Sequence, residues 1–152
     1  MGSPPPRPPP PPPSPDAGGP APGPAELFGL WEASVTAEYA SLTRTGAPVT
    51  VPTTPYVGNG GRSLDVSTGL TYPAKAERAR RDPRVCLLFA DPVGSGIDAP
   101  PTVLVQGLAT VRDCDLQANT DRYVRASMKR FPDAHEGTAA LRPARPHAVT
   151  LL

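Results

Sequence analysis

Three hydroxyl side chains and one lysine stand together at the junction of two patterned segments in the middle of the chain. Ser67, Thr68 and Thr71 precede Lys75, one of only two lysines in the sequence, within the stretch VSTGLTYPAK. A helix N-terminus exposes unpaired N–H groups and a partial positive charge, so preceding hydroxyls and a lysine in the first turn can together hold a phosphate. These residue types in this order predict an anion site if a helix begins here.

A structural role for the same residues is the alternative. Arg78, Arg80, Arg81 and Arg84 follow Lys75, and the five cations could form a solvated helix face, with the hydroxyls as turn and cap residues. The whole chain carries a formal net charge of only +1 and 5% aromatic residues. A nucleic-acid-binding domain is typically strongly basic with interleaved aromatic residues, so this partner class is not expected.

Five segments around this group have the pattern of β-strands. Pro52 and Pro55 each remove a backbone donor from the second segment, which predicts an edge or irregular strand. The apolar run RVCLLFA predicts a strand that is buried on both faces. The five segments are residues 36–43, 48–57, 62–68, 84–90 and 102–112.

Helices are predicted between and after these strands. The short cationic helix should be capped by Thr71 or Tyr72, carry Pro73 in its first turn and end at Asp82, because a residue before proline avoids the helical region. A longer amphipathic helix is predicted from Asp115 to Phe131, and a weaker helical pattern covers 27–35. The predicted fold class is therefore mainly β (α+β), an antiparallel barrel with a short helix between strands three and four and a longer C-terminal helix.

Composition sets the expected domain organisation. Residues 1–24 hold 13 of the 24 prolines and almost nothing that could be buried, so a disordered Pro-rich tail is expected over 1–24 and a single domain over 25–152. The chain shows neither a membrane-length apolar run nor the apolar core of a signal peptide, so a cytoplasmic location without a membrane partner is expected. Cys86 and Cys114 lack metal-ligand spacing and are expected to be unpaired thiols, with no metal bound.

The order of these pieces resembles a known family. ASLTRTGAPVTVPTTPYV, then VSTG followed by a lysine, an Arg-rich helix and RRDPRV, is similar to the flavin-binding split β-barrel family. That family includes pyridoxamine 5'-phosphate oxidase and the actinobacterial flavin/deazaflavin oxidoreductases. The likeness covers roughly Glu32 to Arg130.

The resemblance implies an FMN-dependent oxidoreductase of unknown substrate, with the cofactor at a homodimer interface; the deazaflavin coenzyme is the alternative cofactor. The hydroxyls and the lysine before and in the short helix would hold the flavin phosphate: Ser67, Thr68, Thr71 and Lys75. The second strand would offer backbone groups to the flavin ring: Val51, Pro52 and Thr53. No side chain stands out as a catalytic acid or base, since His135 and His147 lie in a poorly patterned segment and are expected at the surface.

Two departures from the family pattern leave other functions open. Pro73 occupies the place where family members commonly have a serine, and the family usually continues through a further strand that closes the barrel. Here HAVTLL is either a short version of that strand, or the sequence is that of a truncated relative. The alternatives are a non-catalytic flavin-, deazaflavin- or haem-binding module, and an interaction protein that uses its Pro-rich arm.

Overall fold

A computed structural model describes residues 24–69, 73–90, 93–132 and 146–151, and for 146–151 only the backbone. Its helices are α1 (Pro24–Ala33), α2 (Ala74–Arg81) and α3 (Leu116–Arg130), with one 3₁₀ turn, η2 (Asn59–Gly61). Its strands are β1 (Ala37–Leu42), β2 (Pro48–Thr53), β3 (Pro55–Gly58), β4 (Ser63–Gly69), β5 (Arg84–Phe89), β6 (Val103–Arg112) and β7 (Pro146–Leu151). The tail predicted over 1–24 falls almost entirely outside the described residues and stays a prediction.

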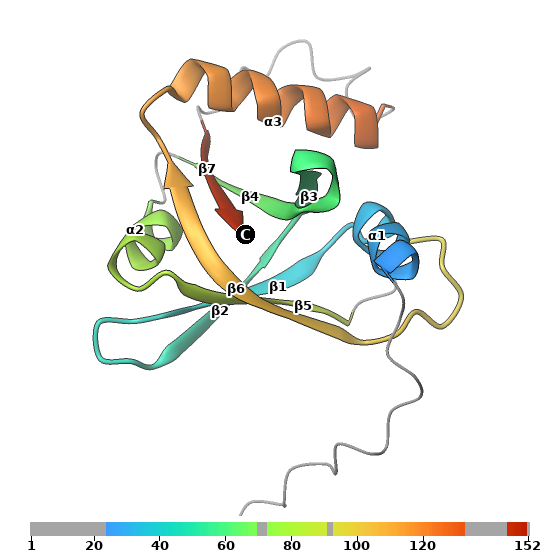
Figure 1. Ribbon diagram of the computed structural model, residues 1–152, viewed down its shortest axis with the longest axis horizontal. Helices are drawn as coiled ribbons and strands as arrows, with labels where there is room; N and C mark the ends of the chain where they lie inside the picture. Colours follow the sequence, from blue (N-terminus) through green and yellow to red (C-terminus); the bar gives the residue numbers. More distant parts are fainter. Residues whose placement is uncertain (1–23, 70–72, 91–92, 133–145, 152) are drawn as a thin grey trace, which may run out of the picture.

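The strands form one antiparallel sheet in the order β2-β1-β5-β6-β7-β4-β3. β2 and β3 stand at opposite ends of that order, yet only Thr54 separates them in the sequence. The two ends of the sheet must therefore meet, and the sheet curls into a barrel (Figure 1). The predicted antiparallel, mainly β fold is confirmed.

The second predicted strand is divided in two at Thr54. Pro52 in β2 lies opposite Glu38, and Pro55 in β3 lies opposite Val66. Both prolines sit in strands at the ends of the sheet order. Proline is tolerated there because its missing N–H can face the open side, where no neighbouring strand needs a donor. The prediction of an edge strand is confirmed, and the bend lets one segment serve both ends of the sheet.

The described part of the segment HAVTLL, residues 147–151, belongs to a strand that closes the sheet. In β7, Val149 lies opposite Val66 of β4 and Val111 of β6. Of the two possibilities left by the sequence, this pairing supports the short closing strand. The longer helix α3 is consequently followed by a strand, and Figure 1 shows α3 lying across β7.

The core lies inside the barrel, where alternate strand residues meet the helices. Its largest fully buried side chains include Tyr39, Val66 and Leu87. In β5, Val85, Leu87 and Phe89 are buried, whereas Cys86 and Leu88 on the other face are partly exposed. The prediction that this strand is buried on both faces is wrong, because the described helices contribute their apolar residues to the inner side only.

Both helices predicted beyond residue 70 are present. α2 begins one or two residues later than predicted: Pro73 occupies the N-cap with helical dihedral angles (φ −74°, ψ −6°) and no side-chain cap, since its ring fixes φ in the helical range. Thr71 and Tyr72, the predicted caps, lie outside the described residues. Asp82 ends α2 in an extended conformation as predicted, and Asp115 caps α3 by accepting a hydrogen bond from the Ala118 N–H at 2.9 Å. None of the described helices combines the length and apolarity needed to cross a membrane.

Candidate functional site

Lys75 joins α2 to the ends of two strands. Its ammonium nitrogen Nζ donates to the Thr53 hydroxyl at the end of β2 (3.2 Å) and to the Ser67 backbone carbonyl in β4 (2.9 Å). The same nitrogen lies 5.7 Å from the centre of the Tyr39 ring. We call these four residues the lysine cluster. It brings together the second and third predicted strands and the start of the cationic helix, the three pieces that the sequence singled out.

The charge of Lys75 is poorly compensated. Within the described part of the chain no carboxylate lies within ion-pairing distance of its ammonium. Burial, and secondarily the positive charge of Arg78, lowers the pKa of Lys75 from 10.5 to about 8. An ammonium has three N–H donors, and the two protein acceptors leave one for a further partner. The arrangement therefore fits an anionic group such as a phosphate, which would restore the full charge of the lysine.

The predicted hydroxyls divide between two sides of β4. The Ser67 side chain lines a small cavity under α3 together with Asn119 and Arg122, so only its carbonyl reaches Lys75. Thr68 points to the other, buried face of the strand and is 7% exposed. Ser67 and Thr68 thus cannot present both hydroxyls to one ligand, because successive strand residues alternate in direction. Thr71 lies outside the described residues.

The predicted residues of β2 also divide by face. Val51 lies opposite Tyr39 and packs partly buried against the core, whereas Pro52 is exposed on the outer face. Thr53 lies on the same face as Val51, where its hydroxyl reaches Lys75. β2 stands at the end of the sheet order, so one of its edges pairs with no described strand.

The arginines of α2 have a structural role that the sequence did not reveal. Arg78 donates to the Ser41 hydroxyl at 2.8 Å, Arg81 donates to the Leu42 carbonyl at 3.1 Å, and Arg80 forms an ion pair with Asp113. These contacts fasten α2 to β1 and to the end of β6. The arginines of α2 therefore form neither a fully solvated face nor a phosphate site shared with Lys75. Among the cations of α2, Lys75 is the one left for a ligand.

Tyr39 is a member of the cluster that sequence reasoning missed. It is fully buried, its hydroxyl has no hydrogen-bond partner among the described residues, and burial raises its pKa to about 12. Its alternation with Ala37 and Ser41 marks it as a core residue, but nothing in the sequence places its ring beside a lysine 36 positions away. His147, expected at the surface, occupies the β7 position opposite Thr68.

Comparison with known proteins shows a shared fold. No protein-family model and no curated protein sequence matches the chain. A candidate pyridoxamine 5'-phosphate oxidase from Listeria innocua has a similar structure, with a TM-score of 0.60, 18% identity, and coverage of 85% of this chain and 91% of that one. A conserved hypothetical protein from Mycobacterium tuberculosis gives a TM-score of 0.63 at 21% identity, covering 84% and 78%.

The haem storage protein HutZ from Vibrio cholerae is similar as well, with a TM-score of 0.57, 16% identity, and coverage of 84% and 87%. The chain therefore has the split-barrel α+β fold of pyridoxamine 5'-phosphate oxidase-like proteins, as the sequence resemblance implied. Proteins with this fold differ in what they bind, so fold alone does not assign the function.

Proposed function

We propose that the protein is a flavin-dependent oxidoreductase that binds FMN, with the lysine cluster as its phosphate site. The observation that carries the proposal is the half-buried Lys75, which no described carboxylate neutralises and which stands in the first turn of α2. A half-buried cation without a counter-ion is costly unless a ligand supplies the opposite charge. The split-barrel fold shared with a candidate pyridoxamine 5'-phosphate oxidase supports the choice of a phosphorylated flavin.

The protein groups around the phosphate have distinct roles in this proposal. The third N–H of Lys75 donates to a phosphate oxygen, while Thr53 and the Ser67 carbonyl hold the ammonium in place. The first intrahelical bond runs from the Glu77 N–H to the Pro73 carbonyl, so the N–H groups of the preceding helix residues have no intrahelical acceptor. Those donors and the helix dipole favour an anion at the same end of α2.

The open edge of β2 is the proposed contact for the flavin ring. The carbonyl of Pro52 and both backbone groups of Thr50 can face that edge. Val51 and Thr53 direct theirs to β1, because hydrogen-bonded pairs recur at every second residue from the Thr43–Ala47 pair. When bound, the flavin supplies the electron-transfer chemistry, and the protein contributes binding, orientation and exclusion of water. The deazaflavin coenzyme also carries a phosphate, so the same lysine could serve it.

A homodimer is the proposed assembly, and the outer face of the sheet is its proposed interface. Leu104 and Leu108 on β6 are 54% and 58% exposed, and in the neighbouring strand β5 Leu88 lies opposite Leu104 and Arg84 opposite Leu108. Exposed leucines interspersed with polar side chains, with no described element covering them, are compatible with an association surface. An isologous dimer through this face would bury the leucines of one subunit against those of the other.

The redox proposal is tested with FMN-loaded protein under anaerobic conditions. Addition of NADH or NADPH is expected to bleach the flavin absorbance near its visible bands, and admission of oxygen to restore it. Dithionite followed by oxygen is the control that shows the bound flavin can cycle. A loaded protein that cycles with dithionite but with neither NADH nor NADPH would contradict an oxidoreductase that uses these donors.

Haem binding is the second candidate function, because the haem storage protein HutZ has the same fold. Titration with hemin distinguishes the two. A sharp, saturable Soret band together with no FMN binding supports the haem module, whereas FMN binding that hemin does not displace supports the flavin site.

A further inference from the structure

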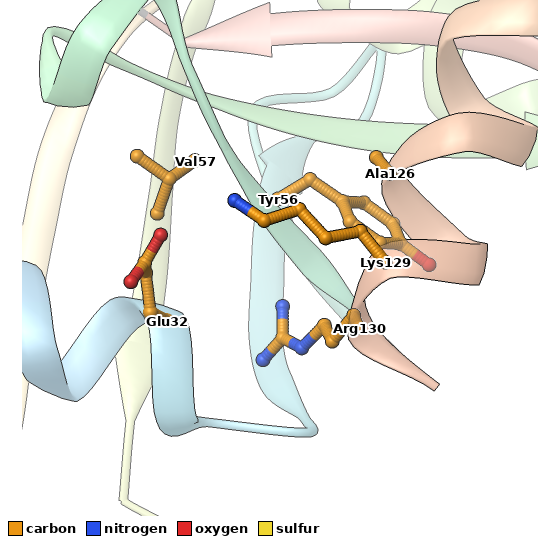
Figure 2. Close-up of a pocket in the computed structure, with 6 residues that line it drawn as sticks. All are labelled: Glu32, Tyr56, Val57, Ala126, Lys129 and Arg130. Carbon is orange, nitrogen blue, oxygen red and sulfur yellow. The ribbon is translucent and has the colours of Figure 1, made fainter. Parts of the chain in front are cut away.

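A cleft separate from the lysine cluster lies between α1, β3 and the last turn of α3. Its volume is about 280 Å³. Figure 2 shows the six residues that line it, which we call the α1–α3 cleft: Glu32, Tyr56, Val57, Ala126, Lys129 and Arg130. Tyr56, Val57 and Ala126 supply an apolar wall, and the other three supply two positive charges and one negative charge.

Arg130 places a poorly compensated positive charge at this cleft. Its guanidinium donates to the backbone carbonyls of Pro55 and Ser34, which ties α3 to the bend between β2 and β3 and to the end of α1. It also lies 5.7 Å from the Tyr56 ring centre. Burial lowers its pKa, with Tyr56 and the Glu32 carboxylate acting in the opposite direction, and no carboxylate of the described chain forms an ion pair with it. An anion in the cleft would be attracted to a guanidinium that is already fixed in position.

Glu32 and Lys129 stand on different sides of the same opening. Glu32 projects from α1, and Lys129 extends from α3 toward the side of the cleft formed by α1 and β3 (Figure 2). Although their charges are opposite, they do not form an ion pair. Each is exposed, and neither forms an ion pair in the described part of the chain, although Glu32 lies close enough to act electrostatically on Arg130. The cleft therefore offers both an acceptor and donors to a single ligand.

We propose that the α1–α3 cleft binds a small organic zwitterion, with its carboxylate at Lys129 and Arg130, its ammonium at Glu32 and its apolar body against Tyr56 and Val57. The two cations outnumber the one carboxylate, so the anionic end of the ligand dominates recognition and the cationic end adds selectivity. The volume lies just below the range of about 300 to 1,000 Å³ that is usual for drug-sized ligands, which selects a small metabolite. This site needs neither the flavin nor the lysine cluster.

NMR titration of the flavin-free, ¹⁵N-labelled full-length chain tests the proposal with three para-substituted probes. They are 4-(aminomethyl)benzoate, which carries both charges, 4-methylbenzoate, which lacks the ammonium, and 4-methylbenzylamine, which lacks the carboxylate. The zwitterion should bind with a Kd on the order of 1 mM, shift the Tyr56, Val57 and Ala126 amides, and bind more tightly than either single-charge probe. No saturable shift of these amides by any probe up to about 10 mM would overturn the proposal.

Charge-neutralising variants test the role of each end. Lys129→Gln should weaken both carboxylate probes about twofold to fivefold, whereas Glu32→Gln should weaken only the zwitterion by a similar factor. Arg125→Gln is the matched control, because Arg125 is an exposed cation on α3 that does not line the cleft. Two outcomes would contradict the assigned contacts. One is that Lys129→Gln and Arg125→Gln weaken probe affinity equally; the other is that Glu32→Gln weakens both carboxylate probes equally. Either result would leave only diffuse attraction to a cationic helix.

Discussion

Replacing Lys75 with methionine removes the charge at the proposed phosphate site while keeping an unbranched side chain of similar length. The fold should tolerate the change. In the free protein the ammonium is half-buried without a carboxylate, so its loss removes a desolvation cost together with the hydrogen bonds to Thr53 and the Ser67 carbonyl. These effects oppose each other, and the melting temperature is expected to stay within a few degrees of wild type.

The expected loss of FMN affinity follows from the donors of Lys75. Two of its three N–H groups have protein acceptors at 3.2 and 2.9 Å, which leaves one charge-assisted bond for a phosphate oxygen. Such a bond contributes about 1.5 to 3 kcal/mol. The Lys75→Met variant should therefore bind FMN about tenfold to a hundredfold more weakly.

Quenching of flavin fluorescence measures the affinities, and riboflavin is the discriminating ligand. Riboflavin lacks the phosphate, so wild type and Lys75→Met should bind it equally. Lys129→Met is the matched control, since it changes the only other lysine of the chain at an exposed position of α3. An equal loss of riboflavin and FMN in Lys75→Met, or an equal loss of FMN in both variants, would refute the assignment of Lys75 to the phosphate.

Four further predictions concern pH, assembly, the core and the tail. The pKa of Lys75 in the free protein is about 8, so FMN affinity should be level from about pH 7 to 8 and then fall about tenfold per pH unit. The fall is expected because above its pKa the lysine must take up a proton before it can bind the phosphate. Lys75→Met should show no such fall. Leu104→Asp combined with Leu108→Asp should convert a dimer to a monomer in light scattering, and an unchanged dimer would move the interface elsewhere. Tyr39→Phe should raise the melting temperature by about 2 to 5 °C, because it removes a buried hydroxyl with no described partner; a decrease would reveal a partner. Deleting residues 1–23, which are rich in proline and poor in apolar side chains, should shift the melting temperature by less than about 2 °C, and a larger fall would mean that the tail packs on the domain.

The strands of the barrel could be predicted wherever alternation and turn residues coincide. β1, β4, β5 and β6 lie within or close to the predicted segments because their buried residues recur at every second position. The division of the second strand at Thr54 could not be predicted. Its two prolines indicate an edge strand, but they do not show that the two halves lie at opposite ends of one sheet. β7 is short, and its partners β4 and β6 are distant in sequence, so the local pattern alone could not place it.

The lysine cluster could be predicted only in part. Lys75 and its neighbourhood followed from residue types, but the contact with the Thr53 hydroxyl spans 22 positions and depends on where the tertiary fold places α2 relative to the end of β2. The alternation in β4 already implied that Ser67 and Thr68 point to opposite faces, which excludes a shared ligand for both hydroxyls. The partners of Arg78 and Arg81 are a hydroxyl and a backbone carbonyl of β1, and a sequence gives no signal for such contacts.

The absorption spectrum of the purified chain after incubation with FMN and desalting tests the flavin proposal most directly. We expect a yellow protein in which the visible flavin bands are shifted relative to free FMN and in which the bound flavin approaches one per chain. The folded protein should retain FMN more strongly than riboflavin, because the phosphate meets Lys75. A folded sample that emerges colourless after incubation with FMN, FAD and the deazaflavin coenzyme in turn would contradict the proposal.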